Sequence, residues 1–493
     1  MPAQTDSSSS ERRLRGVRAV DYDRSALTAG IVHIGVGNFH RAHQAVYLDR
    51  LFSLGVDHDW AIIGAGLMPY DAQMRADLRA QDWTSTVVEL DPSGLTAMTV
   101  GAMIDYADAT SAGLIAALSG PEIRIVSLTV TEGGYFVDAQ SGGLDLTHDA
   151  IKHDIAQPNA PRTVFGCLIA ALKVRRADGI APFTIMSCDN LPENGAVTRA
   201  TVLALARQTD PAFADWIDRS VCMPNGMVDC ITPATSDRER ELVRDTFGIE
   251  DRRPVTCEPF RQWVLEDTFS AGRPALEKVG VEFVDDVAPY ELMKLRILNG
   301  GHAAIAYPAA LLDIAYVHEA MAHPLVRAFL ETLERREIIP TVPAIPGVDF
   351  NAYFETVCAR FSNAAVGDTI PRLCLDGSNR QPKFILPTIV DRLRDGRPID
   401  GLALEVALWC RASAGQSESG QAIKVADERA DALTAKARAT KHNPTAFLEL
   451  GDVFGPLGHD RQFREAFANA ITALWRNGTE PTMRAYVDGA SMS

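Results

Sequence analysis

The amino-acid sequence predicts an α/β domain followed by a mainly α-helical domain. The chain has 493 residues, which is too long for one ordinary hydrophobic core. From residue 31 to about residue 285, short apolar runs rich in β-branched residues alternate with longer stretches of helical spacing. Beyond that point only helical periodicity remains. We therefore expect two domains, at residues 1–285 and 286–493.

Five short runs in the first part have the composition of buried strands. They are IVHIGVG (31–37), WAIIGAGL (60–67), TSTVVEL (84–90), EIRIVSLTVT (122–131) and FTIMSCDN (183–190). Several are apolar throughout, as strands are when helices cover both faces of a parallel sheet. Between them lie segments of helical spacing such as AHQAVYLDRLFSLG and VFGCLIAALKVRRADG. This alternation predicts a doubly wound sheet of the extended Rossmann type.

The second part of the chain carries helical periodicity in six segments. They are ELMKLRILNGGHAAIAY, HPLVRAFLETLERREI, FILPTIVDRLRDG, ALEVALWCRASAG, DERADALTAKARAT and REAFANAITALWRNG. Apolar residues recur three and four positions apart in each of them, which places one apolar stripe along a helix. We expect a mainly α-helical second domain.

Composition and charge argue against several classes of protein. The net charge of −16 opposes attraction to nucleic acid or to an anionic membrane. The eight cysteines are scattered without the close Cys/His spacings of a structural zinc site, so we expect no metal. No run is apolar enough for a signal peptide or a membrane span, and we expect a cytoplasmic protein. The sequence leaves the oligomeric state open, and a monomer is compatible with it.

A glycine-rich turn follows the first predicted strand, in the segment HIGVGNFHRAH (33–43). Gly35 and Gly37 match the first two glycines of a G-x-G-x-x-G turn, which presents backbone N–H groups to a pyrophosphate. The third position holds His40, so the helix must lie further from the strand. A tight strand–helix turn that binds nothing fits this motif equally well.

Asp71 is the acidic residue that follows the second predicted strand, in GAGLMPYDAQ. An acidic side chain in that region of a dinucleotide-binding fold accepts hydrogen bonds from the adenosine ribose of NAD. The alternative is an acidic residue in the first turn of a helix, which the helix dipole favours. The motif therefore favours NAD over NADP.

The segment YELMKLRILNGGH (290–302) sets a lysine, an asparagine and a histidine among apolar residues. At about 100° per residue of an α-helix, Asn299 and His302 lie about 140° and about 80° from Lys294, on one side of the helix. A single lysine or histidine on a helix is more often a solvated or core residue. Tyr290 and Lys294 also match the Tyr-x-x-x-Lys pair of short-chain dehydrogenases, but they lie far from the glycine turn and we set the match aside.

Asn190 ends the predicted strand that precedes LPENG (191–195), at the edge where open α/β sheets bind ligands. Its amide could instead satisfy a local turn. Oxidation of a secondary alcohol needs a base for the hydroxyl proton and donors for the oxygen, and a lysine with two amides supplies both. We expect Lys294 to be the base, and Asn190 and Asn299 to be the donors.

Several longer segments resemble the polyol-specific long-chain dehydrogenases over essentially the whole chain. They are GVGNFHRAHQAVY, PEIRIVSLTVTEGGY, FTIMSCDNLPENGAVTR, MVDCITP, CEPFRQWVLEDTF, GRPALEKVGVEFVDDVAPYELMK, NGGH and RFSN. The resemblance implies a zinc-free oxidoreductase with an extended nucleotide-binding domain and a helical second domain. The family motif K-x-x-x-x-N-x-x-H falls on Lys294, Asn299 and His302.

The resemblance also implies a role for each matching residue. Lys294 would be the general acid/base, Asn190 and Asn299 the oxyanion donors, and Glu291 part of the proton path. His302, Arg372 and Arg380 would bind substrate, although Arg380 stands where the family has a lysine, and an arginine does not simply replace a lysine. Gly35, Gly37, Asn38, Phe39 and Asp71 would contact the coenzyme.

The implied reaction interconverts a polyol and its ketose, with D-mannitol and NAD giving D-fructose and NADH. Sister enzymes that reduce fructuronate and tagaturonate share MKLRILNG, whereas TEGGY and DNLPENG favour the mannitol branch. Glu132 in TEGGY would repel a uronate carboxylate if it lines the pocket. A dehydrogenase of D-arabinitol or D-sorbitol remains an alternative, as does an interaction protein built on an idle nucleotide fold.

Overall fold

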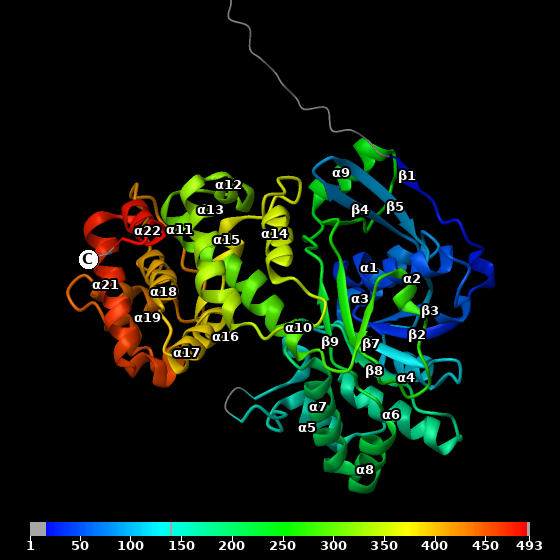
Figure 1. Cartoon of the computed structure of the whole chain (residues 1–493). Coiled ribbons are helices and arrows are strands. Elements are labelled where there is room, and N and C mark those ends of the chain that lie inside the picture. Colours follow the sequence, from blue (N-terminus) through cyan, green and yellow to red (C-terminus); the bar gives the residue numbers. More distant parts are fainter. Residues whose placement is uncertain (1–15, 139–140, 491–493) are drawn as a thin grey trace, which may run out of the picture. The chain divides into compact units, whose positions relative to one another are not determined.

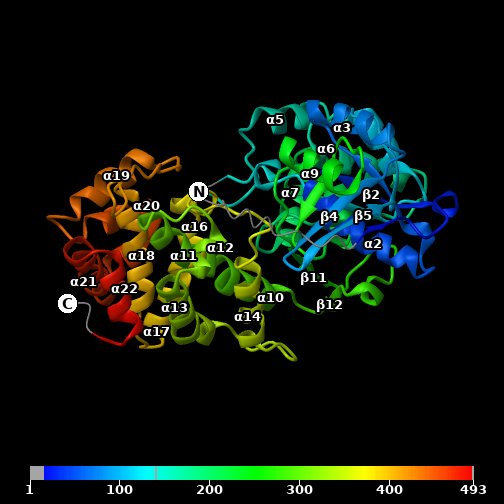
Figure 2. The same cartoon turned by 90° about the horizontal axis from the view of Figure 1, so that it is seen from above.

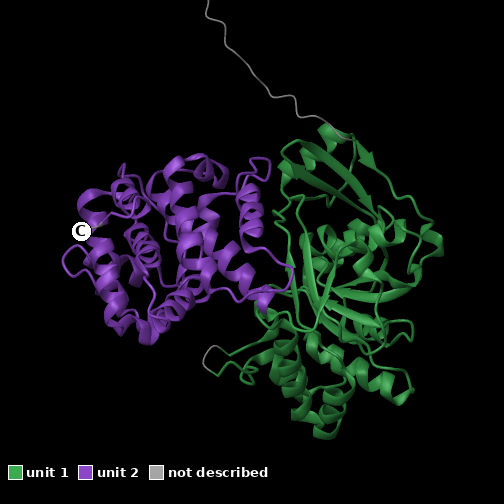
Figure 3. Cartoon of the chain, in the orientation of Figure 1, with its two compact units in different colours: residues 1–288 green, residues 289–493 purple. Residues whose placement is uncertain are grey.

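The protein is described here by a computed structural model that covers residues 16–138 and 141–490. The chain divides into two compact units, Met1–Ala288 and Pro289–Ser493 (Figure 3). Each unit has its own secondary-structure class and is described by itself.

The first unit contains a five-stranded parallel sheet (Figure 1). Its strands are β2 (Ala29–Ile34), β3 (Ala61–Ala65), β6 (Met103–Tyr106), β7 (Ile125–Leu128) and β8 (Thr184–Ser187). Their spatial order is β6-β3-β2-β7-β8, and all neighbouring pairs are parallel. Numbered along the chain this is the 3-2-1-4-5 order of a Rossmann sheet. The predicted fold class is confirmed.

The predicted strand at 84–90 forms but belongs to another sheet, so its expected place in the doubly wound sheet is wrong. It is β4 (Ser85–Asp91), which pairs antiparallel with β5 (Gly94–Val100) across a two-residue turn. The sheet is completed by β1 (Val17–Arg18) and β10 (Val255–Cys257). A third sheet holds β9 (Gly226–Asp229), β11 (Gln262–Glu266) and β12 (Glu282–Val284). Apolar composition marks a strand but not its partner.

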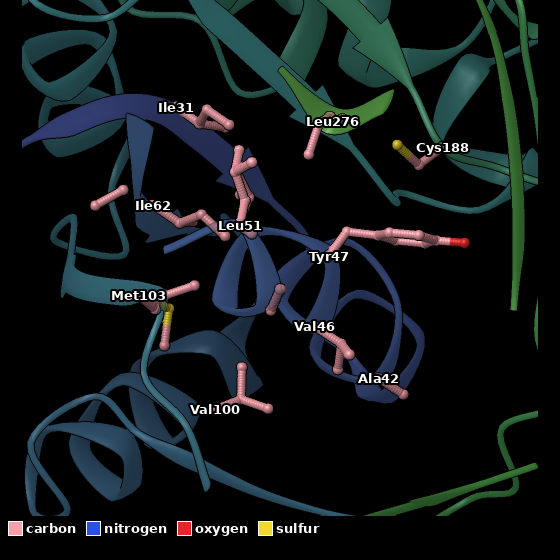
Figure 4. Close-up of a cluster of buried hydrophobic side chains, with 14 of the residues drawn as sticks. Ile31, Ala42, Val46, Tyr47, Leu51, Ile62, Val100, Met103, Cys188 and Leu276 are labelled. Carbon is pink, nitrogen blue, oxygen red and sulfur yellow. The ribbon is translucent and has the colours of Figure 1, made fainter. Parts of the chain in front are cut away.

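Helices cover both faces of the parallel sheet. The helices of the first unit are α1 (Asn38–Ala42), α2 (Gln44–Ser53), α3 (Pro69–Arg79), α4 (Ser111–Ser119), α5 (Asp149–Ala156), α6 (Val164–Ala177), α7 (Asn194–Thr209), α8 (Pro211–Ser220) and α9 (Asp237–Phe247). Ile31 of β2 packs in the cluster around α2, whereas Val32 and Ile34 pack in the cluster that includes α4, α6 and α7. Figure 4 shows side chains of β2, β3 and β6 gathered around α2. Burial on both faces explains why these strands are apolar throughout.

The second unit is mainly helical, as predicted. Its helices are α10 (Ala288–Met293, which begins at the last residue of the first unit), α11 (Gly300–Leu311), α12 (Val317–Ala322), α13 (Pro324–Leu333), α14 (Phe350–Phe361), α15 (Ile370–Leu373), α16 (Gly377–Phe384), α17 (Leu386–Arg394), α18 (Asp400–Ser413), α19 (Ala430–Ala439), α20 (Gly451–Phe454), α21 (Arg461–Asn477) and α22 (Thr479–Val487). Helix α18 packs against both α11 and α21 (Figure 2). Nearly all of its residues are buried, so it forms the centre of this unit.

Candidate functional site

The glycine turn lies where the strand order of the parallel sheet reverses, between β2 and β7. Ligands of open α/β sheets bind at such a point, beyond the carboxyl ends of the strands. Gly35 follows β2 with φ +96°, and a methyl group there would lie 2.2 Å from the carbonyl oxygen of Thr129. At Gly37 the nearest atom to such a methyl group is 3.8 Å away. Gly35 is thus required by the fold, while Gly37 keeps space open beside the turn.

His40 occupies the third position of the glycine motif and lies against β2. Its ring stacks on the ring of His33, with centroids 3.4 Å apart and planes 13° apart. Burial lowers the pKa of His33 to about 3 and the pKa of His40 well below its ordinary value, so both rings are neutral near pH 7. A pair of neutral rings fills the space between helix and strand that a third glycine would close.

Asn38 and Phe39 form the first turn of α1. The amide of Asn38 donates to the carbonyl oxygen of Pro233 at 3.1 Å and to Thr235 Oγ1 at 2.9 Å. Phe39 stacks on the ring of His43 at 4.8 Å between centroids. The side chain of Asn38 therefore ties the glycine turn to the chain that follows β9, which holds its backbone in place.

Asp71 is buried in the first turn of α3, which follows β3. One carboxylate oxygen accepts the backbone N–H of Met68 at 2.7 Å, so Asp71 caps its own helix. Its side chain is only 3% exposed, and burial raises its pKa. The capping alternative is therefore present in the structure. Asp71 also lies beyond the carboxyl end of β3, where a ribose-binding carboxylate is found in this fold.

Asn190 is exposed and follows β8, and its neighbour Asp189 fixes this chain end. The carboxylate of Asp189 accepts the backbone N–H groups of Val130 and Thr131 at 3.1 and 2.8 Å, and the hydroxyl of Tyr135 at 2.8 Å. The ends of β7 and β8 are thereby joined. Asn194 also binds this chain end, because its amide donates to the carbonyl oxygens of Asp189 and Gly226 and accepts the N–H of Gly226.

The segment that carries Lys294 differs from its expected geometry. Lys294–Asn299 forms a π-helical turn between α10 and α11, and the N–H of Gly300 bonds to the carbonyl of Leu295. The expectation of a regular α-helix with about 140° between Lys294 and Asn299 is therefore wrong. A π turn joins residues five apart by hydrogen bonds, which brings side chains at that spacing onto the same side. Such turns occur frequently at functional sites.

Burial of the lysine segment matches a protected reaction centre. Lys294 is 8% exposed, and Glu291, three residues earlier on α10, is 9% exposed. Asn299 is partly exposed. The backbone therefore places an amine and a carboxyl group in a dry environment, beside an amide that solvent or a ligand can reach.

His302 on α11 lies close to three arginines of the same unit. Its ring stacks on Phe361, with centroids 4.0 Å apart. Burial lowers its pKa well below the ordinary value, and the charges of Arg372, Arg360 and Arg380 lower it further. Its Nε2 atom is buried and has no hydrogen-bond partner among the residues that the structure describes. A neutral imidazole with one nitrogen available suits a ligand hydroxyl.

Arg372 and Arg380 are both held by neighbouring groups. Arg372 forms an ion pair with Asp368, which raises the pKa of the guanidinium. Arg380 donates to the carbonyl oxygens of Leu373 at 3.1 Å and Arg372 at 3.3 Å. The spacing of four residues between Asp368 and Arg372 is a signal of this ion pair that the sequence analysis missed. Arg360 was also missed as a neighbour of His302.

A buried hydrogen bond between a carboxyl group on α18 and an amide on α16 was missed as well. Glu405 on α18 is fully buried and accepts the amide of Gln381 at 2.7 Å. Burial raises the pKa of Glu405 to about 8. Gln381 follows Arg380 in the sequence, so the pair is anchored to the helix that also carries a predicted substrate residue. A glutamate within the apolar run ALEVALWC was the available signal.

The predicted residues thus form one group in each unit. Gly35, Gly37, Asn38, Asp71 and Asn190 lie at the carboxyl edge of the sheet in the first unit. Lys294, Asn299 and His302 lie on η5 (Lys294–Asn299) and the start of α11 in the second unit. No cluster of three or more His, Cys, Asp or Glu side chains suited to a metal ion occurs in residues 16–138 and 141–490. Across the same ranges, no helix has the length and apolar character of a membrane span.

Comparison with known protein families finds one match in each unit. The family model described as Mannitol dehydrogenase Rossmann domain matches residues 29–278, and the one described as Mannitol dehydrogenase C-terminal domain matches residues 286–475. The chain belongs to the mannitol dehydrogenase family. This membership confirms the predicted resemblance and the prediction of an oxidoreductase.

Three similar proteins show how far the similarity extends. A mannitol 2-dehydrogenase of Cereibacter sphaeroides is 56% identical over 475 residues, which cover 96% of this chain and 99% of that protein. The Pseudomonas fluorescens mannitol 2-dehydrogenase, solved as a ternary complex with NAD and D-mannitol, is 42% identical with a TM-score of 0.84 and covers 96% and 97%. A substrate-free D-sorbitol dehydrogenase is 35% identical with a TM-score of 0.89 and covers 94% and 97%.

Proposed function

We propose that the protein is a zinc-independent, NAD-dependent polyol dehydrogenase that oxidises D-mannitol to D-fructose. The observation that carries the proposal is the π turn, which brings the buried Lys294 and the partly exposed Asn299 onto one side of the helix, followed by His302 with an available nitrogen. Similarity to a mannitol 2-dehydrogenase solved with NAD and D-mannitol supports the substrate and the coenzyme.

The residues of the first unit fit NAD. Gly37 lacks a side chain where a methyl group would have open space, which lets a pyrophosphate approach the backbone of the turn. Asn38 and Phe39 begin the helix that follows, and Asp71 would accept the ribose hydroxyls. When bound, NAD supplies the acceptor for the hydride that leaves C2 of the polyol. A 2′-phosphate beside buried Asp71 would be repelled, which favours NAD over NADP.

The residues of the second unit supply the proton chemistry. Lys294 in its neutral form takes the proton of the C2 hydroxyl, and Asn299 donates a hydrogen bond to the oxygen as negative charge develops on it. Asn190, a residue of the first unit, would be the second donor. Glu291, one helical turn before Lys294, would carry the proton away. The same groups work in reverse when the ketose is reduced.

His302, Arg372 and Arg380 would hold the remaining hydroxyl groups. Both arginines lie close enough to His302 for their charges to lower its pKa. Arg380 replaces the lysine of the family, and its guanidinium is already engaged with two carbonyl groups. We therefore expect this substitution to affect the preference among polyols.

A second candidate is oxidation of D-sorbitol, which the structural similarity to a D-sorbitol dehydrogenase favours. One experiment decides between the two. Hexitols, pentitols and ketouronates are assayed with NAD and with NADP, and kcat/KM is compared. D-Mannitol with NAD should give the highest value. Faster turnover of D-sorbitol selects the second candidate, and faster reduction of fructuronate than of fructose contradicts both.

Dialysis against a strong chelator tests zinc independence. Full activity should remain, because Lys294 takes the role of the base that a metal-bound hydroxide would otherwise fill. Loss of activity that added zinc restores would contradict the proposed mechanism.

A further inference from the structure

Two cysteines far apart in the sequence have thiols in direct contact. Cys230 follows β9 and Cys257 ends β10, and their thiols form a hydrogen bond. The chains that carry them also join, since the N–H of Glu258 donates to the carbonyl of Ile231 at 3.0 Å. The two cysteines are therefore held next to each other by the backbone.

A buried arginine lies against one sulfur. Arg261 Nη2 lies 3.1 Å from Cys257 Sγ, and the side chain of Arg261 is only 2% exposed. A guanidinium in a dry environment stabilises the thiolate form of a neighbouring cysteine. Glu89 forms an ion pair with the same guanidinium, which keeps it in place.

The two thiols have opposite protonation tendencies. The hydrogen bond from Cys230 lowers the pKa of Cys257, burial opposes this shift, and the charge of Arg261 lowers the pKa further, so that the net shift is downward. The same contact raises the pKa of Cys230 well above its ordinary value, together with burial. A thiolate beside a neutral thiol is the arrangement in which one sulfur attacks an oxidant and the second resolves the product. Cys167, by contrast, is buried and its pKa is raised to about 12.

Both cysteines are connected to the glycine turn. Cys230 begins the chain 230–235, in which Pro233 and Thr235 accept the amide of Asn38. Arg261 Nε donates to the carbonyl oxygen of Ala42 at 2.6 Å, and Ala42 ends the helix that Asn38 begins. A change at the two sulfurs can therefore reach both ends of α1.

We propose that Cys257 and Cys230 form a thiol site that hydroperoxides oxidise to a disulfide, and that the disulfide weakens binding of the coenzyme. The second half rests on the proposed function. Only a small oxidant can reach the site, because Cys230 is 7% exposed and Cys257 is fully buried. Hydrogen peroxide is therefore the oxidant that we name.

The chemistry balances in two steps. The Cys257 thiolate attacks one peroxide oxygen, the O–O bond breaks, and Cys257 sulfenic acid and hydroxide form. The Cys230 thiol then attacks that sulfur, the S–O bond breaks, and a disulfide and water form. The sulfurs must approach to about 2.05 Å, which pulls the chain 230–235, and the thiolate that Arg261 contacted is gone.

The first test is mass spectrometry of the full-length protein. The protein is treated with hydrogen peroxide, unfolded in urea in the presence of N-ethylmaleimide, and digested without reductant. A linked peptide that contains Cys230 and Cys257 should appear and should be lost on addition of dithiothreitol. Cys230→Ser should instead give a sulfenic acid at Cys257 that dimedone traps when it is present during unfolding. Maleimide on both cysteines after treatment, with no linked peptide, overturns the site.

The second test is a titration of NADH fluorescence on reduced and oxidised protein. Loss of the two hydrogen bonds that Asn38 makes should weaken NADH binding by about tenfold, and reduction should restore it. Cys230→Ser should bind NADH with wild-type affinity when reduced. Both Cys230→Ser and Cys257→Ser should form no disulfide and should resist the tenfold loss. Cys167→Ser is the matched control and should respond as the wild type does.

Two results contradict the link to the coenzyme. One is a linked peptide with unchanged NADH affinity, and the other is an equal loss of affinity in both serine variants. Failure of the proposed function gives a different result from these two. In that case untreated protein would bind no NADH, while the linked peptide could still form.

Discussion

Replacing Gly35 and Gly37 by alanine separates folding from coenzyme binding within one turn. At Gly35 the new methyl group would lie 2.2 Å from the carbonyl oxygen of Thr129, and the backbone has φ +96°. An L-residue in left-handed backbone costs about 1–2 kcal/mol, and forcing a methyl group against a backbone atom costs about 1–3 kcal/mol more. Gly35→Ala should therefore lower the free energy of unfolding by about 2–5 kcal/mol.

At Gly37 the same change meets no atom closer than 3.8 Å, and φ is −96°. The free energy of unfolding should stay within about 0.5 kcal/mol of the wild type, as at sites without a specific cost. If a pyrophosphate lies against this backbone, the methyl group occupies its place, and NADH affinity should fall about tenfold or more.

Urea unfolding and NADH fluorescence titration measure the two quantities on the same samples. Gly35→Ala should change mainly the free energy of unfolding, and Gly37→Ala only the affinity for NADH. Wild-type NADH affinity in Gly37→Ala would refute the placement of the coenzyme at this turn. Wild-type stability in Gly35→Ala would refute the close approach of Gly35 to Thr129.

Three further predictions concern the second unit and the choice of coenzyme. Lys294→Ala should lower kcat by about 10²–10⁴-fold and abolish the rise of oxidation rate with pH, whereas Asn299→Ala should lower kcat by about 10²–10³-fold and keep that rise. His302→Ala should mainly raise the KM for the polyol. If Lys294→Ala keeps the wild-type pH profile, the role of Lys294 as the base is contradicted. Burial raises the pKa of Glu405 from 4.5 to about 8, so its contribution to the free energy of unfolding is complete below about pH 4.5 and is lost as pH rises to about 8, with a slope of up to about 1.4 kcal/mol per pH unit. Glu405→Gln should remove this pH dependence, measured by urea unfolding at pH 5.5 and pH 8. An unchanged slope would exclude Glu405 as its source. Asp71→Asn should raise the affinity for NADPH relative to NADH in fluorescence titrations, and an unchanged ratio would show that Asp71 only caps its helix.

The Rossmann sheet was predictable because each of its strands has the apolar composition that burial on both faces requires. Strands buried on both faces must be apolar throughout, and Ile31 and Val32 of β2 do point to opposite cores. The same composition misplaced β4, since its antiparallel pairing depends on the turn between Asp91 and Gly94. Local composition reports burial, whereas pairing depends on the path of the chain.

The segment that carries Lys294 also has a feature that local composition does not determine. Its residue types indicated a reaction centre, and its periodicity indicated a helix. The π turn at Lys294–Asn299 was not predictable, because one wider turn changes no residue type and the apolar pattern tolerates it. The angular relation between Lys294 and Asn299 therefore came from the tertiary structure alone.

The sequence by itself determined the fold class, the glycine turn and the types of reactive groups, because each depends on residues close together in the chain. Only the tertiary structure decided that His40 stacks on His33, that Cys230 meets Cys257, and that Glu405 is buried with an elevated pKa. These are contacts and environments made by elements distant in the sequence. Their energies come from burial and mutual geometry, which no short stretch of residues encodes.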